Sequence, residues 1–173
     1  MPEHKHDFGL AAAVAAEAIG KPGNRTFRVL ARNDKSLAVL WLEKEQLQAV
    51  AVAAEELLAQ IRGAGPEEGF EEADPARDFP GQPDVEFKVG QLGIGYDQEG
   101  AFFVLLAYEL DANPEAPATF RCLLSRQQLA GLGRQSQRVC AAGRPRCVLC
   151  GAPLEPAPHF CPPSNGHGAA ASE

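Results

Sequence analysis

The sequence predicts an α+β fold, with antiparallel strands and two amphipathic helices in one small domain. The chain has 173 residues, which is the size of a single domain. About 45% of these residues are hydrophobic, so a core of ordinary size can form. Short apolar segments separated by turn residues precede each of two segments with helical periodicity. This order indicates two β-β-β-α units that share an antiparallel sheet, with both helices on one face.

The first half of the chain predicts three strands and a helix. Leu10–Ile19 and Arg25–Arg32 flank the turn Gly20–Asn24, so we expect them to pair as a hairpin. Ser36–Leu42 is apolar enough to be a strand buried on both faces. Lys44–Arg62 predicts a helix, because its apolar residues recur at spacings of three and four.

The second half predicts the same order of elements. Residues 63–84 are rich in Gly, Pro and acidic residues with few apolar anchors, and we expect a mobile loop there. Strands are then expected over Val85–Tyr96, Ala101–Leu110 and Thr119–Leu124, and a helix over Arg126–Ala142. The helix begins with a capping-box pattern, Ser125 followed three residues later by Gln128.

An internal repeat connects the two halves. Trp41–Leu47 aligns with Leu123–Leu129, which lies 82 residues later. The same offset pairs Val50 with Leu132, so the apolar stripes of both helices coincide. We therefore expect residues 1–142 to form one duplicated core domain.

Residues 143–163 carry a set of side chains typical of a zinc site. Cys147 and Cys150 are separated by two residues, and His159 and Cys161 follow in a loop rich in proline. Thiolate and imidazole are the ligands that zinc prefers, four of them in a tetrahedron. Because the protein would fill all four positions, we expect a closed, structural Zn²⁺ site in a C-terminal knuckle. The pattern does not distinguish zinc from iron, and a redox-active thiol pair is the alternative.

The charge of the chain is distributed unevenly. The formal net charge is −7, which argues against general binding of nucleic acid or of anionic lipid. Residues 119–154 nevertheless contain six arginines and no acidic residue, whereas residues 63–88 hold eight acidic residues and two basic ones. The two regions could be solvated surfaces that attract each other, or the arginines could bind an anionic ligand or partner. The candidate residues for such a surface are Arg25, Arg126, Arg134, Arg138, Arg144 and Arg146.

Other features carry weaker signals. Cys122 lies in an apolar strand and Cys140 on the inner face of the second helix, so we expect both to be small core residues. Gly93 and Gly95 predict a strand against which something packs closely. Residues 164–173 read as a disordered tail.

We expect a cytoplasmic protein. The first residues contain no apolar segment of the kind found in signal peptides, and no run is long enough to span a membrane. In a reducing compartment, five cysteines favour a metal or free thiols over disulfides.

Three segments resemble a bacterial family of uncharacterised proteins. They are Gly20–Phe27, Leu42–Gln46, and Ala142–Leu154 closing on His159–Pro162. The family is catalogued as domain of unknown function 3090, and the resemblance extends from about Phe8 to Asn165. It implies the same architecture and metal site, and it brings no established activity.

These observations favour a non-enzymatic binding or adaptor domain with a structural zinc, because no acid, base and nucleophile converge in the sequence. Its partner would be an unidentified protein or an anionic ligand. One alternative is an enzyme for an anionic or phosphorylated small molecule, which would need a carboxylate such as Glu43 or Glu109 beside the arginines. Another is nucleic-acid binding through the arginine-rich C-terminal region.

Overall fold

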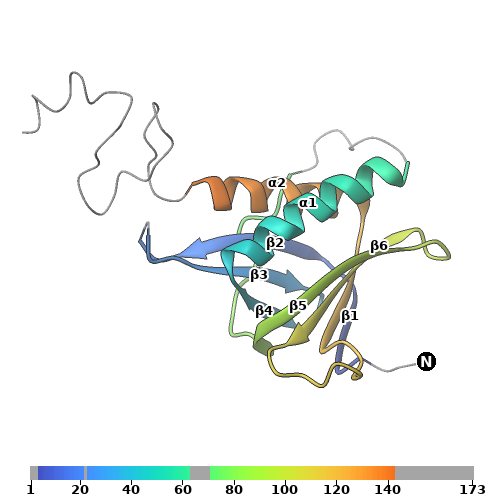
Figure 1. The fold of residues 1–173 in the computed structure, drawn as a ribbon, viewed down its shortest axis with the longest axis horizontal. Coiled ribbons are helices and arrows are strands. Elements are labelled where there is room, and N and C mark those ends of the chain that lie inside the picture. Colours follow the sequence, from blue (N-terminus) through green and yellow to red (C-terminus); the bar gives the residue numbers. More distant parts are fainter. Residues whose placement is uncertain (1–3, 22, 63–70, 143–173) are drawn as a thin grey trace, which may run out of the picture.

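The computed structural model describes residues 4–21, 23–62 and 71–142. These residues form a mixed α+β domain with one seven-stranded sheet and two helices (Figure 1). The α+β class is thus confirmed, and each expected strand and helix is present with small shifts at its ends. In chain order the elements are β1 (His6–Leu10), β2 (Ala13–Ile19), β3 (Thr26–Arg32), β4 (Leu37–Leu42), α1 (Lys44–Gln60), β5 (Val85–Asp97), β6 (Phe102–Glu109), β7 (Phe120–Leu124) and α2 (Arg126–Ala141).

The strands lie in the order β1-β7-β6-β5-β4-β3-β2. Most neighbours are antiparallel, but β4 pairs with β5 and β1 pairs with β7 in parallel. The expectation of an antiparallel sheet is therefore wrong at these two places. Strands β4 and β5 are parallel because α1 connects them, and a helical crossover returns the chain so that the second strand runs in the same direction as the first. Strand β1 was not expected, since its few apolar residues show no strand pattern.

The sheet curves until its two edge strands meet, because β1 and β2 are consecutive in the chain. Between them, the N–H of Ala11 donates to the carbonyl of Leu123 in β7 (2.9 Å). The N–H of the next residue, Ala12, donates to the carbonyl of Arg32 in β3 (2.7 Å). Adjacent residues thus bond to strands at opposite ends of the strand order, and this short link closes the sheet.

The two helices lie side by side over one face of the sheet (Figure 1). They approach closely where Gly133 faces Ala54, since a Cβ added at Gly133 would lie 3.0 Å from the Cβ of Ala54. The core between helices and sheet includes the largest fully buried side chains, among them Leu40, Leu47, Leu105, Phe120, Leu124, Leu129 and Leu132. The apolar stripes expected for both helices account for this packing.

The two halves use their first strand in a similar way. In β5, the first residues pair in parallel with β4, with Val85 opposite Ala38, and the rest pair antiparallel with β6. The segment β1–β2 likewise pairs in parallel with β7, with His6 opposite Phe120, and then antiparallel with β3. Each half therefore begins with a bent strand whose first part contacts the last strand of the other half.

A glutamine in the first turn of each helix fixes the helix to one of these bent strands. In α1, Oε1 of Gln46 accepts from the backbone N–H of Glu43 (2.7 Å), and its Nε2 donates to the carbonyls of Val89 and Gly90 (3.2 Å each). In α2, Oε1 of Gln128 accepts from the N–H of Ser125 (2.8 Å), and its Nε2 donates to the carbonyl of Ala11 (2.8 Å). The capping box expected at Ser125 is confirmed.

The outer face of the first half is covered by residues 71–84. Phe79 is buried there against Leu30 and Val39, which point away from the helices. This anchor was not predicted, because Phe79 is a single aromatic residue between polar residues and prolines. The segment following α1 thus passes around the sheet and packs beneath the strands β2, β3 and β4.

The outer face of the second half is different. A Cβ added at Gly93 or Gly95 would meet no atom within 4 Å, so the described residues do not provide the close packing expected there. In β6, the residues that alternate with the core, such as Val104 and Leu106, are partly exposed. None of the described helices has the length and apolar character needed to cross a membrane.

Candidate functional site

The four expected zinc ligands, Cys147, Cys150, His159 and Cys161, lie outside the described residues. Arg144 and Arg146 also lie outside them. Within the described part of the chain, no group of three or more His, Cys, Asp and Glu side chains could hold a metal ion. The zinc site therefore stays a prediction from the chemistry and spacing of its donors.

The two described cysteines are buried, as expected for core residues. Burial raises the pKa of the Cys122 thiol in β7 to about 12, so this thiol is protonated at neutral pH. Burial also raises the pKa of Cys140, whose Sγ donates to the carbonyl of Lys44 at 3.8 Å. Neither thiol has the low pKa of a nucleophile or of a reactive redox cysteine.

Arg126 caps the C-terminus of α1. Its guanidinium donates to the carbonyls of Leu58 (3.4 Å) and Ile61, and it lies 5.6 Å from the ring centroid of Phe103. The last turn of α1 has no basic residue of its own, so Arg126 satisfies carbonyls that would otherwise lack a partner.

Arg134 and Arg138 both face Glu72, on the segment that follows α1. The Glu72 carboxylate lies 2.7 Å from Nη2 of Arg138 and 4.0 Å from Nε of Arg134. The hydrogen bond to Glu72 raises the pKa of Arg138 further above its ordinary value. The arginine-rich and acidic regions therefore do attract each other, and these contacts fix the segment 71–84 to α2.

Sequence reasoning missed Gln135, which closes the open edge of β2. Its Oε1 accepts from the backbone N–H of Ala16 (2.8 Å), and its Nε2 donates to the carbonyl of Ala73 (3.1 Å). The side chain is 9% exposed. A glutamine in a helix carries no pattern that would predict such a role, since its partners lie 119 and 62 positions away.

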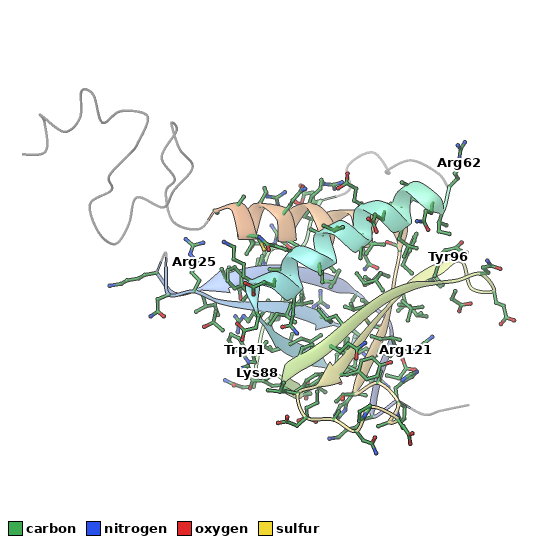
Figure 2. All side chains as sticks on the ribbon, in the orientation of Figure 1. Arg25, Trp41, Arg62, Lys88, Tyr96 and Arg121 are labelled. Carbon is green, nitrogen blue, oxygen red and sulfur yellow. The ribbon has the colours of Figure 1, made fainter. Side chains whose placement is uncertain are left out.

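Arg25 differs from the three described arginines of α2. It follows the turn between β2 and β3, at the end of the molecule where α2 ends (Figure 2). Its Nε is buried and has no hydrogen-bond partner among the described residues. The turn before it requires glycine, because Gly20 has φ +108 and an added Cβ would lie 2.6 Å from the carbonyl oxygen of Asn24.

The carboxylates that an anion-processing site would need lie elsewhere. Glu43 is exposed and lies 3.9 Å from Nζ of Lys88. Glu109 lines a cavity of about 330 Å³ beside the β6–β7 connection, and no arginine is among the residues that line it. The described arginines and these two carboxylates are thus not brought together.

A second cavity, of about 280 Å³, lies between the β1–β2 link, α2 and residues 71–78. Arg32 and Arg77 line it together with Asp78. Arg77 holds the pKa of Asp78 at about 2 through a hydrogen bond, and the backbone N–H of Asp74 also contributes. The Nε of Arg32 donates to the backbone carbonyl of Asp78 (2.7 Å), so Arg32 and Arg77 both bond to this residue.

The curved sheet with two helices on one face defines a small α+β domain. The family described as "Protein of unknown function (DUF3090)" matches residues 6–161, and the chain belongs to this family. The match includes the described domain and also the segment with Cys147, Cys150, His159 and Cys161. No curated protein and no solved structure matches the chain.

Proposed function

We propose that this protein is a zinc-binding domain with a non-enzymatic binding or adaptor role, in which one zinc ion stabilises the C-terminal segment. The donor set Cys147, Cys150, His159 and Cys161 carries the proposal. Three thiolates and one imidazole within a short segment match the chemistry of closed structural sites. Such a site contributes free energy to the folding of its own segment.

The partner surface that we propose is centred on the end of α2. Arg25 lies there without a described partner for its Nε, and Arg144 and Arg146 follow Ala142 in the sequence. In contrast, Arg126 and Arg138 are bonded within the domain. A partner with carboxylate or phosphate groups would pair with the guanidinium of Arg25, which is partly exposed.

We also propose that the two halves of the core arose as an internal repeat. The support is the matched order of elements, the two bent first strands and the pair Gln46 and Gln128, which make the same bonds 82 positions apart. The protein is proposed to act in the cytoplasm, where reduced thiols are available for a metal.

Elemental analysis of the purified protein tests the zinc site. We expect about one zinc per chain in the wild type, and none in the Cys147→Ser, Cys150→Ser variant. A matched control is Cys122→Ser, which removes a buried thiol of β7 and leaves the metal content unchanged. A wild-type protein without metal would contradict the proposal and would favour a thiol pair.

Counting of reactive thiols tests the same site without measuring metal. In the zinc-loaded protein we expect slow alkylation of all five cysteines. After chelation, Cys147, Cys150 and Cys161 should react fast, whereas Cys122 and Cys140 stay slow because burial raises their pKa. Fast reaction of three thiols before chelation would speak against a bound metal.

A further inference from the structure

The strand β5 has an open edge in its second part. Its first residues, Val85–Lys88, pair with β4, but from Gln91 to Asp97 the register pairs it with β6 alone. In an antiparallel ladder every second residue directs its N–H and C=O away from the partner strand. Among the described residues, no hydrogen bond reaches these groups on the open side.

The equivalent edge in the first half is covered. There, α2 packs along β2, and Gln135 accepts from the N–H of Ala16 on the side that faces away from β3. In α1 the position 82 residues before Gln135 is Ala53, which cannot reach a strand with a hydrogen bond. The edge of β5 therefore lacks the polar cover that β2 has.

The outer face next to this edge also lacks a cover. In the first half, residues 71–84 pass across α2 and the edge of β2 and bury Phe79 on the outer face. In the second half the corresponding face presents Gly93, Gly95, Val104 and Leu106, with free space above the two glycines. No described segment packs there.

We propose that residues 143–163 form this missing cover, crossing α1 and the open edge of β5 and packing on the outer face of β5 and β6. This segment follows α2 as residues 63–84 follow α1, and it has the length for the same path. Its apolar side chains include Leu154 and Phe160. The proposal rests on the zinc site proposed above, because the zinc would hold the segment in one conformation.

One exposed side chain supports this path. Glu72 contacts Arg134 where the first segment crosses α2. The positions that correspond to this pair, at the same offset of 82 residues, are Leu154 and Val52. Val52 is 55% exposed, which is unusual for a large apolar residue on a helix of this domain. An apolar contact between Val52 and Leu154 would replace the ion pair of the first half.

Hydrogen exchange of the full chain, resolved by residue, tests the proposal. In the zinc-loaded protein we expect slow exchange of the outward amides of 91–97. After chelation, or in the Cys147→Ser, Cys150→Ser variant, these amides should exchange at least about tenfold faster. The amides of β2 serve as an internal control, since α2 covers them with or without zinc.

A substitution in the proposed contact surface gives a second readout. Gly95→Glu puts a carboxylate into free space that the knuckle would fill, so it should weaken the apparent affinity for zinc by about tenfold. Gln98→Glu adds the same charge at the exposed turn beyond β5 and should leave the affinity unchanged. Equal zinc affinities of both variants would overturn the proposal.

The outcomes separate this inference from the proposed zinc site. One bound zinc together with fast exchange of residues 91–97 would overturn the inference and leave the zinc site intact. Protection that rises with protein concentration would also overturn it, because the strand edge of a second copy would then be the occupant. A protein without zinc and with a fast-exchanging β5 edge would overturn both proposals.

Discussion

In the first half of the chain, α1 ends beneath the guanidinium of Arg126, and the following residues return over α2 to bury Phe79 under the sheet. In the second half, α2 ends next to the backbone carbonyl of Lys44, which accepts a hydrogen bond from the Cys140 thiol, and no described residue returns to cover β5 and β6. The strands and helices of both halves run in the same order. The order of elements therefore repeats more closely than the connections that complete each half, so the connections are the place to search for function.

The largest expected effect concerns one glycine in each half of the chain, Gly20 at the β2–β3 turn and Gly95 in β5. Gly20→Val forces a side chain into φ +108 and against the carbonyl of Asn24, so it should lower the free energy of unfolding by about 3 kcal/mol. Gly95→Ala, in the open second half, should change it by less than about 1 kcal/mol. Urea unfolding followed by circular dichroism measures both. Similar losses in the two variants would remove this contrast between the halves.

The next effect tests the cover of the β2 edge. Gln135→Met keeps the volume of the side chain but leaves the N–H of Ala16 and the carbonyl of Ala73 without partners, which should cost about 2 kcal/mol. Gln137→Met changes an exposed residue of the same helix and should be close to neutral. Faster hydrogen exchange at Ala16 should accompany the loss in the first variant. If both variants unfold alike, the edge does not depend on Gln135.

A smaller loss of stability is expected when either of the two first-turn glutamines, Gln46 and Gln128, is replaced. Gln46→Met and Gln128→Met each remove a bond to the helix start and a bond to a bent strand, so each should cost about 1–2 kcal/mol. Gln48→Met, on the exposed side of α1, is the control. Thermal unfolding of the three variants gives the comparison. If the two variants lose very different amounts of stability, the similar hydrogen bonds of Gln46 and Gln128 do not contribute similar free energies.

The smallest effect concerns the ion pairs of the connecting segment. Arg138→Gln removes a contact between two side chains that are 60% and 23% exposed, so it should cost about 0.5 kcal/mol or less. The difference from the wild type should shrink at high salt, because salt screens exposed charges. Chemical unfolding at low and at high ionic strength measures it. A loss that is large and independent of salt would assign Arg138 a role beyond this ion pair.

Sequence patterns predicted the strands and helices well, because each of them carries a local signal. The apolar stripe of α1 and the capping box at Ser125 are visible within a few residues. The missed features depend on partners that are far apart in the chain. Strand β1 exists because it pairs with β7, and Gln135 matters because it reaches Ala16.

The candidate site shows the same limit. The sequence reveals a strip of arginines but not the direction in which each one points. Arg126 caps a helix that ends 65 positions earlier, and Arg138 reaches a carboxylate 66 positions earlier. Charge counts thus indicated an attraction between the two regions as one of two interpretations, while the individual bonds required the fold.

The short link at Ala11 and Ala12 has a consequence for how the chain folds during synthesis. The strand that it closes pairs with residues made much later, since Asp7 and Arg121 are 114 positions apart. At roughly 5–20 residues per second, β1 waits on the order of ten seconds on the ribosome before β7 has been made. During this time Phe8, whose ring later lies 4.9 Å from that of Phe120, has no aromatic partner. The residues of β1 are therefore among the last of the described residues to reach their native contacts, and until then the Phe8 side chain is open to contacts with other chains.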